Sequence, residues 1–105
     1  MNDADAVFAA LADGTRRELL RAIATSGPTT ATQLASTRHI TRQAVAKHLS
    51  VLSDAGLVSG HRDGREVRFH ADTEPLAAAR EWIDATGAAW DRRLGRLRDL
   101  LNGPE

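Results

Sequence analysis

The segment between residues 41 and 71 constrains the fold most, because its hydrophobic pattern changes from helical to strand-like at one glycine, Gly56. Before Gly56, apolar residues recur at steps of three and four, as one face of a helix requires, and Thr41 is a residue type that caps helices. After Gly56, two runs of strand composition, 57–62 and 66–71, flank an Asp-Gly dipeptide typical of hairpin turns. The pattern predicts a helix from Thr41 to about residue 55, followed directly by a β-hairpin.

A shorter helix is predicted just before this segment. Thr30, followed three residues later by Gln33, is the signature of a capping box, and the helix that it opens ends near Thr37. A short and a longer helix joined by a few residues form a helix-turn-helix, here residues 30–55. The hairpin that follows, 57–71, then has the position of the wing of a winged helix.

Three further helices are predicted on either side of this unit. Residues 3–12 have helical spacing, with acids at the positive N-terminal end. Thr15, with Glu18 three residues on, predicts the cap of a second helix. A stripe of apolar residues predicts a long last helix over 73–101. Gly87 lies within that helix, and the sequence leaves open whether the helix is continuous there.

With 105 residues the chain has room for one domain. We predict a single winged helix-turn-helix domain over residues 1–105, mainly α with a small β-hairpin, in the order four helices, two strands and one helix. The formal net charge is zero, but between Arg38 and His70 six Arg or Lys stand against three acids, which leaves an excess of three positive charges there. The basic middle of the chain is therefore suited to phosphate.

The composition excludes several other functions. Cysteine is absent, which rules out disulfides, thiolate metal sites and a cysteine nucleophile. The N-terminal residues form neither a signal peptide nor a membrane span, so we expect a cytoplasmic protein with no membrane partner. No phosphate-binding glycine loop, nucleophile elbow or metalloprotease motif occurs, and the sequence predicts no enzyme and no cofactor. The histidines lack the paired spacing of metal ligands, and no metal site is predicted.

Three stretches of the chain resemble the ArsR/SmtB family of winged-helix repressors: LADGTRRELLRAI, ITRQAVAKHLSVLSDAGLV and GREVRFHA. The resemblance covers nearly the whole chain. It implies a dimer built from the first and last helices, palindromic operator DNA, and repression that often includes the protein's own operon. The family's cysteine ligands, and its Asp and His ligands along the last helix, have no counterpart here, since no histidine follows His70. The C-terminal WDRRLGRLRDLL resembles the branch of the family without recognised metal ligands.

The polar face of the longer helix supplies the predicted base-reading residues. Arg42 and Lys47 carry donors that pair with guanine, and Gln43 carries the donor and acceptor that pair with adenine. Thr41 is a cap first, and contacts phosphate as well only if the geometry permits. The residues predicted to contact DNA are Thr30, Arg38, Thr41, Arg42, Gln43, Ala46, Lys47, His48, Ser50, Arg62, Arg65 and Arg68.

The last helix has more apolar surface than a small core can absorb, so we expect a second copy of the chain to cover it. The dimer is predicted to form through residues 1–12 and 73–101. Trp82 and Trp90 are interpreted as interface core, with a small-molecule pocket between the last helices as the alternative. The predicted interface residues are Val7, Phe8, Leu11, Leu76, Ile83, Trp90, Leu94 and Leu97.

These features together predict a sequence-specific regulator of transcription that binds double-stranded DNA as a homodimeric repressor of a palindromic operator. One alternative is a repressor of the same fold that responds to a metal ion or a small molecule. Another is a winged helix used as a protein-interaction module. Such a module is expected to expose apolar anchors on the longer helix, where this chain has Arg42, Gln43 and Lys47. Neither the operator sequence nor an effector can be predicted.

Overall fold

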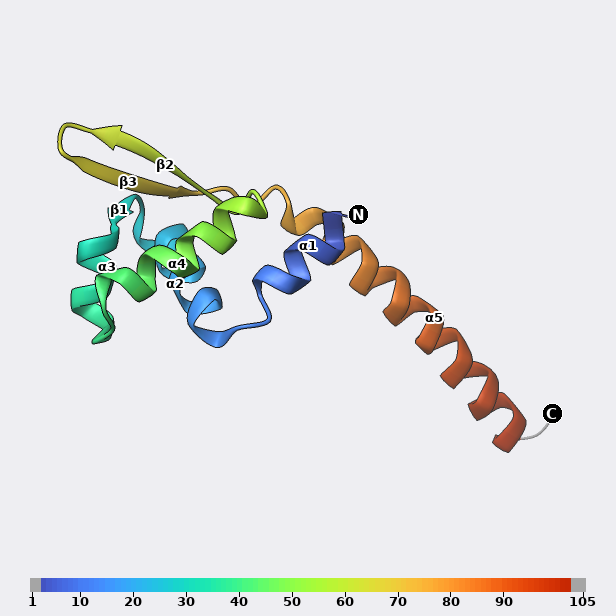
Figure 1. Ribbon diagram of the computed structural model, residues 1–105. Helices are drawn as coiled ribbons and strands as arrows, with labels where there is room; N and C mark the ends of the chain where they lie inside the picture. Colours follow the sequence, from blue (N-terminus) through green and yellow to red (C-terminus); the bar gives the residue numbers. More distant parts are fainter. Residues whose placement is uncertain (1–2, 103–105) are drawn as a thin grey trace.

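The computed structural model describes residues 3–102, which form five α-helices and a three-stranded antiparallel sheet (Figure 1). The expected fold class, a mainly α winged helix-turn-helix, is confirmed, while residues 1–2 and 103–105 of the predicted domain lie outside the described residues. The elements are α1 (Asp3–Ala10), α2 (Gly14–Ser26), β1 (Thr29–Thr30), α3 (Ala31–Arg38), α4 (Arg42–Asp54), β2 (Val58–Asp63), β3 (Glu66–Ala71) and α5 (Leu76–Asn102).

The core lies where α2, α3, α4 and the base of the hairpin meet. Leu19, Leu52 and Leu57 are fully buried there, and no polar side chain among the described residues is buried with them. Each fully buried leucine contributes about 1.5 to 3 kcal/mol relative to an exposed one. The apolar face predicted for α4 thus packs against the core, and its polar face lies at the surface.

Hydrogen bonds at the start of the helices confirm two predicted caps and correct a third. Thr30 Oγ1 accepts from the backbone N–H of Gln33, 3.1 Å away, and Thr41 Oγ1 accepts from that of Ala44, 3.0 Å away. The cap predicted at Thr15 is wrong. Asp13 caps α2 instead, because its carboxylate accepts from the N–H groups of both Thr15 and Arg16.

The sheet has one strand that the sequence pattern did not indicate. β1 pairs antiparallel with β3, opposite Phe69 and Arg68, so β3 is the central strand. β2 and β3 pair from Val58 opposite Ala71 to Asp63 opposite Glu66, and the two-residue turn between them contains Gly64 at a φ of 65°. The turn therefore lies one residue later than expected, and β2 begins at Val58 instead of at residue 57.

α5 is continuous through Gly87 and projects away from the rest of the molecule (Figure 1). It begins at Leu76, three residues later than predicted, after a turn in which Asp72 accepts from the N–H of Glu74. The radius of gyration is 19.3 Å, against about 13 Å for a compact chain of 100 residues. Within residues 3–102, no helix is both long and apolar enough to span a bilayer.

Candidate nucleic-acid interface

One face of α4 packs into the core, and the opposite, outer face is therefore exposed to solvent. Val45, Leu49 and Leu52 anchor the helix in the core, with exposed fractions of 1% or less. The remaining sides carry five of the predicted DNA-contacting residues, all of them exposed: the base-reading Arg42, Gln43 and Lys47, together with Ala46 and Ser50. The first two lie in the first turn, directly after the Thr41 cap. Side chains at this position can enter a groove ahead of the helix.

A groove of about 810 Å³ runs between α3, the start of α4 and the wing. It brings together residues that lie far apart in the sequence, from the cap of α3 to the tip of the hairpin. Six of the predicted DNA-contacting residues line it: Thr30, Arg42, Gln43, Ala46, Arg65 and Arg68. Lys47 and Ser50 are exposed on α4 beyond this groove.

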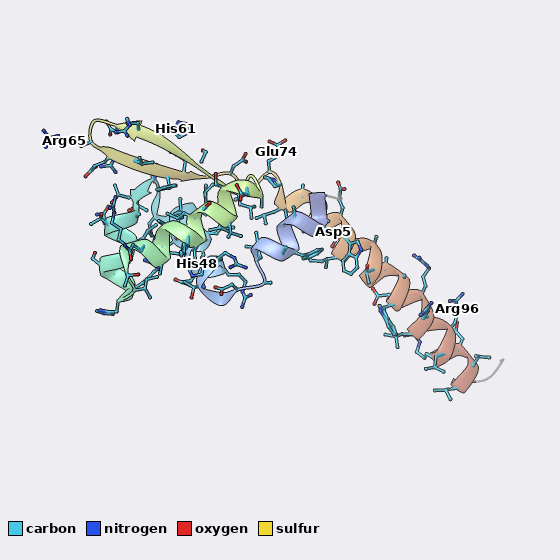
Figure 2. The ribbon with its side chains drawn as sticks, viewed as in Figure 1. Asp5, His48, His61, Arg65, Glu74 and Arg96 are labelled. Carbon is cyan, nitrogen blue, oxygen red and sulfur yellow. The ribbon has the colours of Figure 1, made fainter. Side chains whose placement is uncertain are left out.

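The positively charged side chains around this surface differ in whether a carboxylate of the same chain pairs with them. Arg42, Lys47, Arg62 and Arg65 are exposed and form no ion pair within residues 3–102. Arg68 is half-buried and lies 3.4 Å from the Asp63 carboxylate and 3.5 Å from that of Glu66. Two acids therefore offset its charge, and within residues 3–102 the unpaired cations of the wing are Arg62 and Arg65. Figure 2 shows Arg65 at the tip of the hairpin.

Arg38 is held within the protein. Its Nη2 lies 3.6 Å from a carboxylate oxygen of Glu18 on α2, and its Nη1 donates to Thr37 Oγ1 at 2.7 Å. The buried Nε has no hydrogen-bond partner among the described residues. These contacts direct the guanidinium toward α2, so a structural role explains Arg38 better than the predicted phosphate contact.

His48 also faces inward. It is half-buried, on the side of α4 near the connection between α1 and α2 (Figure 2). Hydrogen bonds from the backbone N–H groups of Arg16 and Thr15 lower the pKa of Asp13, partial desolvation opposes them, and the nearby charges of His48 and Arg16 lower it further. His48 thus lies beside the cap of α2 instead of on the exposed face of α4.

The exposed apolar residues of α5 form a second surface, which we call the α5 stripe. The stripe residues recur at steps of seven, four, three and four, so they lie along one side of the helix. They are Ile83, Trp90, Leu94, Leu97 and Leu101, and all have exposed fractions above 50%. Trp82, with 54% exposed, borders the stripe and contacts Phe8 of α1 edge to face, with ring centroids 5.5 Å apart.

Three predicted interface residues are already covered within one chain. Val7 is only 1% exposed, and so it has no surface to offer a partner. Leu11 and Leu76 are half-buried and pack against the core. Leu100 and Leu101 are not among the predicted interface residues, although both are 79% exposed. A helical repeat alone cannot show where the contact with α1 stops and the free face begins.

A capped helix with an exposed polar face, flanked by a hairpin with a cationic tip, defines the winged helix-turn-helix class of DNA-binding domains. A family model described as a helix-turn-helix domain matches residues 11–61. YuzN, an uncharacterised HTH-type transcriptional regulator of Bacillus subtilis, is 42% identical over 87 residues, which take in 76% of this chain and 95% of the relative.

Two more comparisons agree with this match. The transcriptional repressor SdpR of Bacillus subtilis is 31% identical over 77 residues, covering 73% of this chain and 84% of the repressor. The solved structure of an ArsR-like transcriptional regulator from Rhodococcus sp. RHA1 has 38% identity and a TM-score of 0.76, over 91% of this chain and 90% of the other. The chain belongs to the ArsR family of helix-turn-helix transcriptional regulators. It is therefore a DNA-binding regulator of transcription, and its relatives are regulators and not enzymes.

Proposed function

We propose that the protein is a homodimeric repressor that binds a palindromic operator in double-stranded DNA, with α4 in the major groove and the wing against the neighbouring backbone. One observation carries the proposal: the polar face of α4 and the cationic tip of the wing border the same groove. A helix fits the major groove of a duplex, and a hairpin beside it then meets the adjacent phosphates.

The side chains of α4 match the groups that base edges present. Arg42 and Lys47 can donate to O6 and N7 of guanine, and Gln43 can pair with N6 and N7 of adenine. Ala46, one turn after Arg42, is small enough for contact with a thymine methyl group. Each well-formed bidentate pair discriminates against the wrong base by about 1 to 3 kcal/mol. These residues therefore supply the sequence specificity.

Phosphate contacts are assigned to the flanking residues. Arg62 and Arg65 form no ion pair with any described residue, so their guanidinium groups at the wing are open to phosphate, and Ser50 lies further along α4. The hydroxyls of Thr30 and Thr41 accept hydrogen bonds as helix caps, which leaves each hydroxyl hydrogen available to a phosphate oxygen. Arg68 contributes less because Asp63 and Glu66 offset its charge, and we leave Arg38 and His48 out of the contact set.

A second copy of the chain is the proposed cover of the α5 stripe. The helix is about 40 Å long at 1.5 Å per residue. The stripe runs from Ile83 to Leu101, along the part of α5 that projects away from the rest of the molecule (Figure 1). Beside it, Trp82, Thr86, Trp90 and Arg93 line a groove of about 360 Å³ that side chains of a partner helix can fill. Large aromatic side chains such as these two tryptophans dominate the energy of protein interfaces.

A two-fold dimer leads to the operator symmetry and to repression. Two α4 helices related by a two-fold axis enter successive major grooves about 34 Å apart, so each reads one half of a palindrome. A dimer bound over a promoter excludes polymerase. The relative SdpR is named a repressor, which supports the same outcome here. Within the described residues, the groove and the outer face of α4 expose two large apolar side chains, Val67 and Val51, each at only 39%, and the remaining exposed residues there are mostly polar, which disfavours the protein-interaction alternative.

DNA binding by the purified protein tests the proposal. Sites are selected from random duplexes and compared with the DNA upstream of the protein's own gene. Gln43→Ala is expected to relax base preference at one position of each half-site, while Arg65→Ala weakens all sites about equally and lowers the salt dependence. Arg80→Ala, on α5 outside both surfaces, serves as the control. Selection of no common sequence would overturn the assignment of α4. So would a Gln43→Ala variant that keeps the wild-type base preference, as the Arg80→Ala control is expected to do.

A further inference from the structure

Two histidines meet on the wing. His61 of β2 and His70 of β3 have ring centroids 4.8 Å apart, with the rings at 89° to each other. The sheet register explains the contact: Ser59 lies opposite His70 and His61 opposite Arg68, so the histidines are diagonal neighbours across the two strands. The eight residues that separate them in sequence gave no sign of this pairing, because only the register of the hairpin brings them together.

Their separation suits a shared metal ion. Imidazole nitrogens bind Zn²⁺ at about 2.0 to 2.1 Å, so two rings on one ion at angles between about 90° and 109° have centroids about 4.5 to 5.2 Å apart. The observed 4.8 Å falls in this range. Both side chains are exposed, so rotation about their side-chain bonds to aim one nitrogen of each ring at a common ion is opposed by little packing.

The surroundings favour a cation at this position. Ser59 Oγ lies 3.2 Å from His61 Nε2, which directs that nitrogen toward the position opposite His70. Arg68 lies opposite His61 in the sheet, and the carboxylates of Asp63 and Glu66 beside Arg68 give these three groups a net charge of −1. Neutral imidazole is a ligand preferred by Zn²⁺, Ni²⁺ and Cu²⁺.

We propose that His61 and His70 form a two-imidazole site for a divalent transition-metal ion such as Zn²⁺, with water in the remaining coordination positions. No group of three or more His, Cys, Asp or Glu within residues 3–102 is placed to hold a metal, so this is an open two-ligand site on the surface. A side chain added at Gly60 would meet Val67 and Phe69, which places those two residues on the opposite face of the hairpin from His61. His61, labelled on the wing in Figure 2, and His70 do not line the groove between the wing and α4, so the metal site lies outside it.

Calorimetric titration of the untagged chain with ZnSO₄, in the absence of DNA, tests the site. One ion is expected to bind per chain at pH 7.5, with shifts of the His61 and His70 ring signals in NMR spectra. His61→Ala and His70→Ala are each expected to weaken binding at least about tenfold, because one imidazole alone has no chelating partner. Binding should also weaken at acidic pH, because protons compete with the metal ion for the imidazole nitrogens.

His39→Asn is the matched control. His39 ends α3 with a φ of 56° and lies outside the wing, and asparagine tolerates this left-handed conformation. The variant should bind Zn²⁺ as the wild type does. Absence of binding at millimolar Zn²⁺, unchanged binding in both wing variants, loss in only one of them, or loss in the His39→Asn variant each overturns the two-imidazole site. Circular dichroism of every variant separates loss of ligand from loss of fold.

Discussion

Arg16 Nε donates a hydrogen bond to the carbonyl oxygen of Ala10, 2.6 Å away, so the first turn of α2 closes the last turn of α1. Arg16 Nη2 adds a bond to Ala9, and Arg17 Nη1 donates to Leu11 at 2.7 Å. The carbonyl groups at the end of a helix lack partners within the helix, and here two arginines supply them. These cations are therefore committed to the chain's own backbone.

Replacement of Arg16 by alanine is expected to loosen α1. The variant loses two hydrogen bonds to the end of the helix, each with a net value of about 1 to 3 kcal/mol because the donor is charged. Amide hydrogen exchange should accelerate in α1, and with it the contact between Phe8 and Trp82 should weaken. Arg21→Ala is the control, since its exposed side chain forms no ion pair in the described part of the chain. Equal exchange rates in the two variants would contradict the role of Arg16.

The charge of Asp13 should make stability depend on pH. The pKa of Asp13 is lowered from 3.8 by the backbone hydrogen bonds that its carboxylate accepts. A carboxyl group with a depressed folded-state pKa stabilises the fold above its unfolded pKa, and this stabilisation is lost as the pH falls through the folded pKa. Asp13→Asn keeps a neutral cap, so its urea midpoint should lie below that of the wild type at pH 6 and approach it below pH 3.8. A constant difference between pH 6 and pH 3 would show that the charge contributes nothing.

Truncation of two adjacent residues of α4 should change the free energy of unfolding by very different amounts. Leu52 is 0% exposed and Val51 is 39% exposed. Leu52→Ala is expected to lower the free energy of unfolding by about 2 to 5 kcal/mol, from lost burial and a residual cavity. Val51→Ala should change it by less than about 0.5 kcal/mol, as surface substitutions usually do. Urea unfolding monitored by circular dichroism compares the two variants. A similar loss of stability in both would contradict the burial of the Leu52 side of α4 and the exposure of the Val51 side.

The helices and their polar faces could be predicted from sequence because they depend on local patterns. The caps at Thr30 and Thr41 and the apolar spacing of α4 need no knowledge of the rest of the chain. The cap of α2 was misplaced because Thr15 and Asp13 both have suitable side chains, and Thr15 also had Glu18 at the capping-box position. Only the observed backbone shows that α2 begins at Gly14, directly after Asp13.

The features that sequence could not provide depend on tertiary contacts. β1 is two residues long, too short for any periodicity, and exists because β3 offers it a free edge. The ion pairs of Arg68 and the contact between His61 and His70 follow from the hairpin register. The candidate DNA-contacting set could be proposed from residue types, but its separation into free and internally paired cations required the positions of Glu18, Asp63 and Glu66.

A charge placed on the α5 stripe should separate the subunits. In the proposed dimer, Leu94→Asp buries a carboxylate in an apolar contact and should weaken self-association at least about a hundredfold, or about 3 kcal/mol. Sedimentation velocity at micromolar concentration measures the effect. Ala88→Asp introduces the same charge at an exposed position on another side of the helix and should leave the association unchanged. A dimer that persists in the Leu94→Asp variant would move the interface elsewhere.

The two glycines of α5 provide a finer test of the same packing. Gly87 and Gly95 are both helical, and a Cβ added at either would meet nothing within 4 Å in the single chain. Alanine in place of a helical glycine stabilises by roughly 0.5 to 1 kcal/mol. Gly95 lies roughly 120° from the stripe at 100° per residue, so Gly95→Ala should raise the urea midpoint. Gly87 lies on the stripe, so Gly87→Ala should weaken the dimer in sedimentation. Identical behaviour of both variants would place Gly87 outside the interface.

Thr30 belongs to two elements at once. It pairs with Arg68 in the sheet, and its hydroxyl accepts from Gln33 in the first turn of α3. The hairpin is therefore connected to the helix-turn-helix by direct hydrogen bonds through Thr30, and a displacement of one is expected to move the other. In the proposed complex a duplex must fit both elements at the same time, so its local twist and groove width affect binding along with its bases.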